Sequence, residues 1–449
     1  MVSAWLRVQR VALLFAEPSC RRHGWRLIAR ALWSWALRLA LPLVFARLWW
    51  RGRREPGYRL AWRERLGLGT PTAPGAVWVH AVSLGETRAA AALIDAMRGL
   101  RPGLRVLLTH GTATGRDAGQ ASVRAGDHQC WLPYDTPGAV RRFLRRHRPA
   151  VCVLMETEIW PNLIEHSARA GVPVVLANAR LSERSARKGR RLAALMEPAA
   201  QRLTLALAQT HDDAQRMREA GAHDVEVCGN LKFDMTPEPH LVARGRAWRS
   251  ALSRAVVLMA SSREGEEEPL LQAWRALPAP RPLLLLVPRH PQRFDEVAAL
   301  VRAAGFTLAR RSVWADTPAA DASDVDVWLG DSMGEMPLYY AAAGVALLGG
   351  SFAPLGGQNL IEAAACGCPV VMGPHTFNFE QAADGALHEG AALREPDLAH
   401  AVPRAVVLAR DSQREAWSRR ALAFAELHKG AARRMAERIF KVAAARIAA

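Results

Sequence analysis

The segment from Gly349 to Phe379 carries the residue pattern that says most about the chemistry of this chain. An apolar run ends there in glycines, a glycine-rich turn follows, and Glu362 falls in the first turns of an expected helix. Glycines let a backbone approach phosphate, a helix N-terminus offers free N–H groups, and a carboxylate accepts both hydroxyls of a ribose. The pattern is typical of a nucleotide-sugar site at the C-terminal edge of a parallel sheet. A strand, turn and helix with packing glycines is the alternative.

Other polar residues that could do chemistry also follow apolar runs. Glu86 comes after VWVHAVS, and Glu156 and Glu158 come at the end of AVCVLMET and just after it. Two residues apart at the end of a strand, Glu156 and Glu158 are expected to project on the same face. Paired carboxylates are costly to bury, so one of them is expected to meet a cation or substrate hydroxyls. Arg289, after LLLLV, is a bidentate phosphate ligand by type, with His290 beside it.

The apolar runs that position these residues alternate with helical patterns, which predicts parallel sheets covered by helices on both faces. A first series consists of VWVHAVS, RVLLTHG, AVCVLMET, VPVVLAN, LTLALAQT and VEVCGN. A second series consists of AVVLMASS, PLLLLVPRH, DVWLGD, GVALLGGS and PVVMGP. Between them, FDMTPEPHLVARGRAW begins with prolines and is interpreted as a linker. The predicted fold class is therefore α/β, with two doubly wound Rossmann-like domains facing across a cleft.

The length of 449 residues and a hydrophobic content of 50% allow each domain a full core. The six cysteines have no metal-site spacing and are interpreted as reduced, buried thiols of a cytosol-facing protein. The predicted organisation has an N-terminal extension and membrane anchor, a first domain, a second domain and C-terminal helices, at residues 1–54, 55–236, 237–411 and 412–449.

Basic charge is concentrated at the N-terminus. The formal net charge is +18, and residues 1–65 hold fourteen Arg against three Glu. The segment from Ala31 to Arg54 is apolar and rich in Trp, ends in a basic cluster and lacks a small-residue cleavage site, so it is not a secretory signal. Its Trp residues suit a membrane interface and its arginines suit anionic headgroups, which favours shallow anchorage over a span. A buried helix of a soluble domain is the alternative. No nucleic-acid-binding signature appears, so no nucleic-acid partner is expected.

Ten short motifs occur in a fixed order along the chain and point to one protein family. They are HAVSLGE (80–86), TATG (112–115), LPYDTP (132–137), ETEIWPN (156–162), NARLSERS (178–185), GNLKFD (229–234), EGEE (264–267), VPRHPQRF (287–294), GDSMGEMPLYY (330–340) and GPHTFNF (373–379). In this order they closely resemble the 3-deoxy-D-manno-oct-2-ulosonic acid (Kdo) transferases of lipopolysaccharide assembly. The resemblance runs from about residue 31 to the C-terminus, and residues 1–27 lie upstream of the usual family start.

The resemblance implies a GT-B type glycosyltransferase with an acceptor-binding N-terminal domain and a donor-binding C-terminal domain. Such an enzyme transfers Kdo from CMP-Kdo to the lipid A precursor lipid IVA, with inversion of the anomeric centre. It implies a Gram-negative protein anchored by its N-terminal segment on the cytoplasmic side of the cell inner membrane. No cofactor is expected.

The resemblance also assigns catalytic roles. The acceptor hydroxyl has to lose a proton as it attacks, and the family makes Glu86 the general base, while a Glu that only complements a helix dipole is the alternative. Glu156 is favoured as a residue that supports the transition state, with Glu158 as the close alternative. Lys232 is expected to assist Glu156, and a solvated loop lysine is the alternative.

The donor site is expected to neutralise the charge that develops on the leaving CMP. No DxD-type acidic motif lies at a strand end, so no metal is expected and protein groups have to do this. The family's CMP contacts match Pro288, Arg289, Met333, Gly334, Glu335, Asn359, Leu360, Ile361 and Glu362. Helix caps at Asp331 and Glu335 are the alternative.

Two departures from the family pattern bear on specificity. Gln358 stands where the family usually has His, and Gln hydrogen-bonds but carries no charge, which bears on donor affinity or rate. His110 and Gly111 alter a threonine-rich acceptor-side loop, which bears on acceptor preference.

Two other classes of protein share some of these features. A UDP-GlcNAc transferase of the same fold would lack ETEIWPN together with GNLKFD. A non-catalytic membrane scaffold gives no reason for Glu86, Glu156, Lys232 and Arg289 to occur together.

Overall fold

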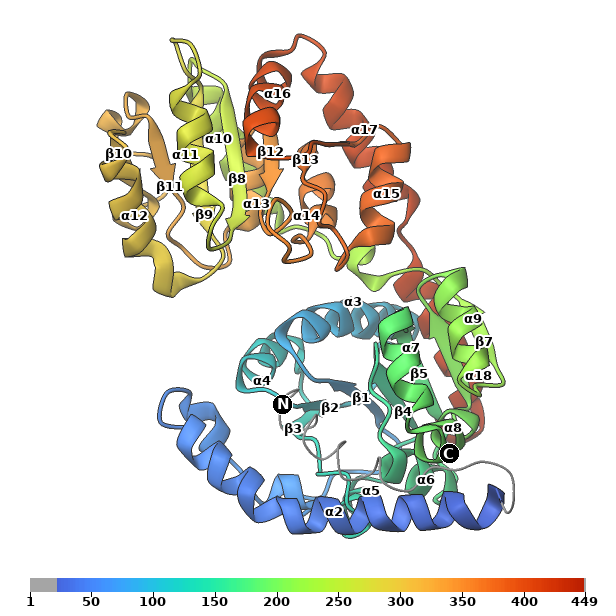
Figure 1. The fold of residues 1–449 in the computed structure, drawn as a ribbon. Coiled ribbons are helices and arrows are strands. Elements are labelled where there is room, and N and C mark those ends of the chain that lie inside the picture. The colour runs from blue at the N-terminus through green and yellow to red at the C-terminus, as the bar shows by residue number, and fades with distance from the viewer. Residues whose placement is uncertain (1–21, 448–449) are drawn as a thin grey trace. The chain divides into compact units, whose positions relative to one another are not determined.

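The computed structural model describes residues 22–447 and divides the chain into two compact units (Figure 1). Unit 1 comprises Met1–Asp234 and Lys429–Ala449, and unit 2 comprises Met235–His428. The predicted domain boundary at 236/237 falls two residues from the junction between the units. The helical stretch expected from residue 412 is divided, because α17 (Arg414–Leu427) lies in unit 2 and α18 (Ala431–Ile447) in unit 1.

Unit 1 is built on a seven-stranded parallel sheet with the strand order β3-β2-β1-β4-β5-β6-β7. Its strands are β1 (Val77–Ala81), β2 (Val106–His110), β3 (His128–Trp131), β4 (Val151–Met155), β5 (Val174–Ala179), β6 (Leu205–Ala208) and β7 (Val225–Val227). Its helices besides α18 are α2 (Arg22–Arg51), α3 (Leu84–Leu100), α4 (Ala113–Gly119), α5 (Pro137–His147), α6 (Pro161–Arg169), α7 (Glu183–Arg190), α8 (Ala193–Gln201) and α9 (His211–Glu219).

Alternation along β1 explains why this sheet is covered on both faces. Val77, Val79 and Ala81 are fully buried in one hydrophobic cluster with α3 and α18. Trp78 points to the opposite face, where it packs in a second cluster that includes Phe143 of α5. A strand buried on both sides reads as a continuous apolar run, which is why the sequence revealed it.

Unit 2 repeats the plan with a seven-stranded parallel sheet in the order β10-β11-β9-β8-β12-β13-β14. Its strands are β8 (Val256–Ser262), β9 (Leu283–Pro288), β10 (Leu308–Arg310), β11 (Val327–Leu329), β12 (Val345–Leu348), β13 (Val370–Met372) and β14 (Ala392–Arg394). Its helices besides α17 are α10 (Pro239–Ala251), α11 (Glu267–Arg275), α12 (Phe294–Ala303), α13 (Met336–Ala342), α14 (Leu360–Ala365), α15 (Glu380–His388) and α16 (Leu398–Arg410).

The prediction of two parallel, doubly wound sheets is confirmed, and all eleven predicted strands are present. Three further strands, β3, β10 and β14, were not predicted, because they are short and include polar or charged residues. The segment interpreted as a linker is also shorter than expected. At this first crossing between the units, residues 235–238 make the connection, and Pro239 begins α10, where proline is favoured at the first helical position.

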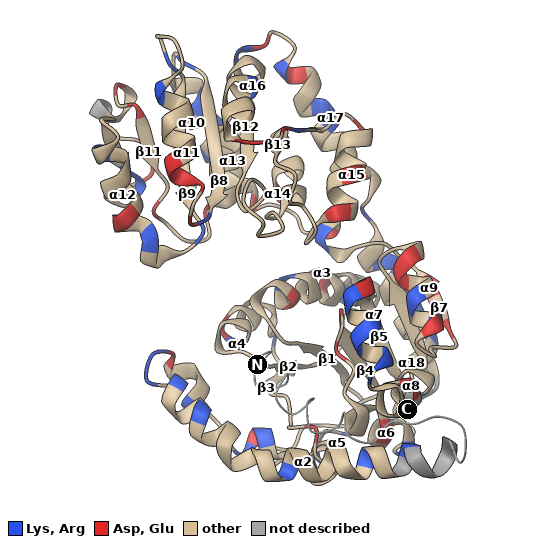
Figure 2. Ribbon diagram, in the orientation of Figure 1, with Lys and Arg blue, Asp and Glu red and all other residues tan. Residues whose placement is uncertain are grey.

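Helix α2 lies along unit 1 and divides into two faces. One face is apolar and exposed, and we call it the α2 stripe: Ile28, Leu32, Trp35, Leu39, Leu43 and Trp50, which recur at helical spacing. Within residues 22–447, Ile28–Arg51 is the helix long and apolar enough to cross a membrane. Arginines follow the stripe to the end of the helix and beyond (Figure 2).

The other face of α2 is fixed to unit 1 by polar contacts. Trp33 Nε1 donates to Asp135 Oδ2 at 3.2 Å, and Ser34 Oγ donates to Asn162 Oδ1 at 3.1 Å. Asp135 also accepts the backbone N–H groups of Asn162 and Leu163 at the start of α6. Two sequence motifs, LPYDTP and ETEIWPN, therefore supply the docking groups of α2.

Candidate functional site

The candidate acceptor residues of unit 1 lie at the point where the strand order reverses. The chain runs from β1 outward to β2 and β3, then crosses to β4 on the other side of β1. The loops after β1 and β4 therefore flank a topological switch point, which is where ligands bind in open α/β sheets. Glu86 follows β1 and Glu156 follows β4 directly.

Glu86 occupies the first turn of α3 and both of its carboxylate oxygens are held. Ser83, the N-cap, donates from Oγ to Glu86 Oε1 at 2.9 Å, and the N–H of Val82 donates to Oε2 at 2.8 Å. Each oxygen keeps a second lone pair, so the oriented group can still accept a proton. Burial raises the pKa of Glu86 and the charge of Glu156 adds to this, while the hydrogen bonds from Val82 and Ser83 oppose it.

Glu156 is brought to the same place by an unusual backbone conformation. Its φ of 57° is in the left-handed region, which costs about 1–2 kcal/mol for a residue with a side chain. Its N–H donates to the carbonyl of Ala177 on β5 at 2.9 Å. Lys232 Nζ lies 3.9 Å from Glu156 Oε1, so the residue that is expected to assist Glu156 is within ion-pair distance of it.

Lys232 is positioned by η5 (Leu231–Asp234), which lies against α3 and α18. The N–H of Leu231 donates to Asn178 Oδ1 at 3.0 Å, and Asp234 accepts the N–H of Ala432 at 2.6 Å. The lysine is therefore held by the packed end of unit 1, and the alternative of a solvated loop lysine does not describe it.

Glu158 lies near Glu156 and Lys232, but its position differs from the one that the sequence predicts. The sequence predicts that Glu156 and Glu158 project from one face of a strand, and this is wrong, because β4 ends at Met155 and the left-handed Glu156 turns the chain. Glu158 accepts a hydrogen bond from Trp160 Nε1 at 2.8 Å. Burial, with the charges of Glu86 and Glu156, raises the pKa of Glu158 to about 8. At neutral pH it is a neutral acid beside two carboxylates.

His110, which departs from the family's threonine-rich loop, is buried at the end of β2. Its Nδ1 lies 3.3 Å from Thr87 Oγ1 of α3, and its Nε2 lies 3.0 Å from Gln129 Nε2. Burial lowers the pKa of His110 to about 4, so the ring is neutral at physiological pH. His110 therefore supports the packing behind the first turn of α3.

In unit 2 the strand order reverses between β8 and β12, and the glycine-rich turn follows β12. A Cβ on Gly349 would lie 2.2 Å from the carbonyl oxygen of Ser261, and Gly350 has a φ of 69°. Only glycine allows the backbone after β12 to approach the last residues of β8 this closely. The first glycine of the segment from Gly349 to Phe379 is therefore required by the close approach of two backbone segments.

Glu266 organises this turn, and the sequence did not single it out. Its buried carboxylate accepts the N–H groups of Arg263, Gly350, Phe352 and Ala353, at 2.8 to 3.3 Å. One side chain therefore joins the loop after β8 to the turn after β12. Its place in the EGEE motif, just before a helix, was the only signal.

Arg289 is exposed at the end of β9, directly after Pro288. Its N–H donates to the carbonyl of Ser262, and within the described chain its guanidinium has no ion-pair partner. Burial and the positive charges of Arg263, Arg289 and Arg293 lower the pKa of His290, so that ring is neutral. These residues make the edge of the sheet beside the switch point electropositive, as phosphate binding requires.

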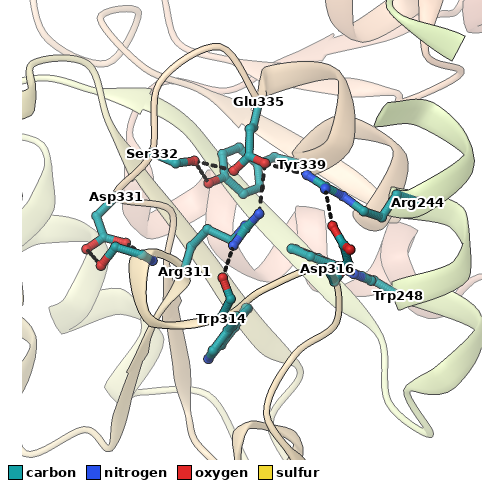
Figure 3. A network of polar contacts seen from close by, with 10 residues as sticks. Arg244, Trp248, Arg311, Trp314, Asp316, Asp331, Ser332, Glu335 and Tyr339 are labelled. Atoms are coloured by element: carbon teal, nitrogen blue, oxygen red, sulfur yellow. Dashed lines mark hydrogen bonds and ion pairs between the residues drawn. The ribbon is translucent and has the colours of Figure 1, made fainter. Parts of the chain in front are cut away.

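The predicted contact residues Met333, Gly334 and Glu335 form a turn before α13, and Figure 3 shows the network beneath it. Glu335 accepts hydrogen bonds from Ser332 Oγ at 2.5 Å and Arg311 at 2.9 Å, and also pairs with Arg244. Its carboxylate is thus already engaged, and it makes no capping bond to α13. Met333 is 63% exposed, and a Cβ on Gly334 would meet no atom within 4 Å, so these two face outward.

Asp331 is likewise engaged within unit 2. Its carboxylate accepts from Arg310 Nε at 2.6 Å and from the N–H and Oγ of Ser312 at 2.7 and 2.6 Å. It fixes the segment after β10 rather than capping a helix.

Asn359 is the N-cap of α14, and its Oδ1 accepts the N–H of Ile361 at 3.1 Å. The side chains of Leu360 and Ile361 are buried, so a ligand could meet only their backbone. Glu362 lies in the first turn of a helix, as predicted, and is partly exposed. Gln358 Nε2 lies 3.3 Å from the position of a Cβ on Gly350, which places the substituted residue against the glycine-rich turn.

The structure thus brings Glu86, Glu156, Glu158 and Lys232 together in unit 1 and gathers the predicted donor residues at one sheet edge of unit 2. Within residues 22–447, no group of three or more His, Cys, Asp or Glu side chains is arranged to hold a metal ion. The five described cysteines are free and buried, and Cys20 lies outside the described residues.

Comparisons with known proteins agree on one family. A sequence profile described as 3-Deoxy-D-manno-octulosonic-acid transferase (kdotransferase) matches residues 60–235. A 3-deoxy-D-manno-octulosonic acid transferase of Bordetella pertussis is 49% identical over 91% of this chain and 98% of its own. The protein with the same description in Haemophilus influenzae is 34% identical over 85% of this chain and 90% of its own.

A solved structure shows the same fold at low identity. The crystal structure of a glycosyltransferase from Rickettsia africae superposes with a TM-score of 0.56 at 11% identity, over 82% of this chain and 99% of that one. This likeness supports the GT-B type fold class and nothing finer. Because its identity to the curated relatives extends over nearly the whole of both chains, the protein belongs to the 3-deoxy-D-manno-octulosonic acid transferase family, the glycosyltransferases that add Kdo in lipopolysaccharide biosynthesis.

Proposed function

We propose that this protein transfers Kdo from CMP-Kdo to lipid IVA with inversion, and that Glu86 is the general base. The observation that carries the proposal is the group of Glu86, Glu156 and Lys232 at the switch point of unit 1. The family membership supports the sugar and the reaction, and leaves the acceptor and the residue roles to be tested.

The environment of Glu86 suits a base that takes a proton from a sugar hydroxyl. A base works best when its pKa lies close to the working pH, since it is then both ionised and strong enough to attract the proton. Burial moves the pKa of Glu86 in this direction, and the hydrogen bonds from Val82 and Ser83 fix the carboxylate in place. The acceptor oxygen attacks the anomeric carbon of Kdo as its proton passes to Glu86, and the bond to the phosphate of CMP breaks.

Glu156 and Lys232 would act on the charge that develops during this step. A carboxylate stabilises a positive oxocarbenium-like carbon, and the ammonium group 3.9 Å away helps to orient that carboxylate. The strained backbone of Glu156 supports this role, because strain of this kind persists where the surrounding structure fixes a functional side chain.

The donor is proposed to bind at the sheet edge of unit 2. Arg289 offers a free guanidinium fork for the phosphate of CMP, and the turn at Met333 and Gly334 offers exposed backbone. Glu362 is proposed to accept the ribose hydroxyls, with Pro288 and Asn359 to Ile361 around it. Glu335 would then hold its turn in place through Arg311 and Arg244, instead of touching CMP.

Membrane association is proposed through the α2 stripe. Because the opposite face of α2 is fixed to Asp135 and Asn162, the helix lies along unit 1 and is suited to rest in one leaflet. Arg38 and Arg47 are exposed on the same helix, and such arginines favour the anionic cytoplasmic surface of the inner membrane.

The test of the whole proposal is the mass of the lipid product. The purified protein is incubated with CMP-Kdo and lipid IVA, and the mass of the lipid product is measured by mass spectrometry. An increase in mass equal to one or more Kdo residues is expected. No increase, under conditions where the protein binds CMP, would refute lipid IVA as the acceptor. UDP-GlcNAc in place of CMP-Kdo should give no product.

A further inference from the structure

A basic cavity lies in unit 1 between α2, α6 and α8, and none of the predicted site residues lines it. Its volume is about 190 Å³. Arg26 and Arg30 come from α2, Glu165 from α6, and Gln201 and Arg202 from α8 and the residue after it. The remaining lining consists of Pro, Ala and Leu side chains.

The charges around this cavity do not balance. The buried carboxylate of Glu165 pairs with Arg30 at 2.5 Å, Arg202 at 2.6 Å and Arg169 at 2.7 Å. Arg26 is paired separately with Glu197 at 2.8 Å. Three guanidinium groups thus share one carboxylate, which leaves an excess of positive charge beside the cavity.

Donors are also left over. Arg30 and Arg202 each give one nitrogen to Glu165, and in the described part of the chain their guanidinium groups have no other partner. A guanidinium carries five N–H donors in a planar fork. The nearby His166 reflects the same excess, because burial and the charges of Arg141, Arg169 and Arg30 lower its pKa.

The cavity fits a compact anion with several acceptor oxygens. Pockets for drug-sized ligands measure about 300–1,000 Å³, so this one is too small for them. Phosphate offers acceptor oxygens in the geometry that guanidinium forks match, and it can bridge more than one arginine. A phosphate group is therefore the ligand chemistry that the unpaired donors and the volume favour.

The position on α2 indicates where such a phosphate would come from. Arg26 and Arg30 project from the face opposite the α2 stripe. An interfacial helix sinks its apolar face about 5–10 Å into the boundary between headgroups and acyl chains, and a helix is about 10–12 Å across. Its opposite face then lies at the level of the lipid phosphates.

We propose that the cavity between α2, α6 and α8 binds the phosphate group of an anionic membrane lipid. This inference rests on the proposed membrane association for the source of the phosphate. The cavity lies in the same unit as Glu86 but takes no part in transfer. It would hold the protein at the surface in one orientation, which the apolar stripe alone cannot do.

The first experiment tests the cavity without a membrane. Dihexanoyl phosphatidic acid is titrated calorimetrically into the full-length protein with CMP present in excess, so that the donor site is filled. The double variant Arg30→Gln with Arg202→Gln should bind it at least about tenfold more weakly, since hydrogen bonds to charged groups are each worth about 1.5–3 kcal/mol. Glu165 keeps Arg169 as its partner in this variant, so no buried charge is left unpaired.

The matched control removes the same charge from the same unit. Arg187→Gln with Arg190→Gln changes two exposed arginines of α7, and binding should be unaffected. Inorganic phosphate should displace the short-chain lipid and bind more weakly than it does. Equal affinity of the double variant, or no displacement by phosphate, would overturn the proposal. Inorganic phosphate binding as tightly as the lipid would overturn the lipid source.

The second experiment uses vesicles of phosphatidylcholine that contain either phosphatidic acid or oleate at equal surface charge. Wild-type protein should partition more strongly into the phosphatidic acid vesicles, and the double variant should lose that preference but keep its binding to oleate vesicles. Equal partition of wild-type protein into both would refute phosphate recognition. If the wild-type protein binds neither kind of vesicle, the proposed membrane association is refuted. The calorimetric titration then still tests whether the cavity binds phosphate.

Discussion

Ser83 and Glu86 cap the first turn of α3 reciprocally: Ser83 Oγ donates to Glu86 Oε1 at 2.9 Å, and the N–H of Glu86 donates to Ser83 Oγ at 3.3 Å. The arrangement is related to a capping box, but the backbone donor that Glu86 accepts is the N–H of Val82, one residue before the N-cap. These contacts are therefore compatible with both hypotheses for Glu86, a residue that only stabilises the start of α3 and a general base. Substitutions can separate them.

Glu86→Gln should keep the cap and lose the chemistry. The amide oxygen can still accept the N–H of Val82, but an amide does not take the proton of a hydroxyl. We expect turnover to fall by about 10²–10⁴-fold with CMP affinity unchanged. Glu86→Ala should lose both, and should also lower the free energy of unfolding by about 1 kcal/mol. If the turnover of the Glu86→Gln variant is close to that of the wild type, Glu86 is not the general base.

Much of this site could be predicted because it follows strands. The runs before Glu86, Glu156 and Arg289 are buried on both faces and stand out as apolar, and a residue that follows a parallel strand must lie at one edge of the sheet. The Gly349 turn was predictable for a related reason, since glycine is required where two backbones meet.

The remainder depends on contacts between distant segments, which no local pattern encodes. Glu266 looks like any acidic residue before a helix until its four N–H donors are seen. The pairing of Glu335 with Arg244 and Arg311 could not be predicted, because both arginines lie far from it in the sequence. The left-handed turn at Glu156 was hidden because the residue is not glycine.

Arg289→Gln should weaken the binding of CMP. The guanidinium is exposed and has no protein partner in the described chain, so its loss removes a ligand contact and leaves the fold intact. We expect the Kd for CMP, measured by calorimetry, to rise about tenfold or more. Arg302→Gln, at an exposed position of α12, is the control and should bind as wild type does. Unchanged affinity in Arg289→Gln would place the phosphate elsewhere.

The stability of the protein should fall as the pH rises toward 8, in part through Glu158. Its pKa is about 8 in the folded protein against 4.5 for an ordinary glutamate, so the folded state holds a proton that the unfolded state releases between these values. The folded state is favoured below this window and loses that advantage as the pH rises through it. Urea unfolding of Glu158→Gln across the window should show a flatter profile than wild type. Parallel profiles would mean that Glu158 is ionised in the fold.

Transfer should survive chelation of divalent cations. Arg289 and backbone N–H groups are expected to neutralise the phosphate of the leaving CMP without a metal. Product formation is measured with and without EDTA, and equal rates are expected. A complete loss that Mg²⁺ restores would point to an acidic metal site, with Glu156 and Glu158 as its first candidates.

The α2 stripe should govern access to acceptor in a bilayer. Leu39→Glu with Leu43→Glu changes two side chains that are 76% and 75% exposed, so folding should be unaffected. Burial of each leucine is worth about 1.5–3 kcal/mol, so sedimentation with membranes should fall at least about tenfold. The apparent KM for membrane-embedded acceptor should rise, while turnover on detergent-dispersed acceptor stays the same.

Leu427→Glu, at an exposed position of α17, is the control for this variant. Deleting residues 1–54 would be a less specific test, because it also removes Trp33 and Ser34 from Asp135 and Asn162. If the double variant still sediments at high salt, another surface of unit 1 binds the membrane.

The return of the chain to unit 1 has a consequence for how the protein is made. Helix α18 supplies Met435, Ile439 and Phe440 to the same hydrophobic cluster as β1 and α3. On the ribosome, that core stays open until the whole of unit 2 has been synthesised, so unit 2 can complete its fold before unit 1 does. A premature stop near residue 430 would keep every predicted site residue in the chain, but it would remove the α18 side chains from the core beneath Glu86 and the contact of α18 with η5, which carries Lys232.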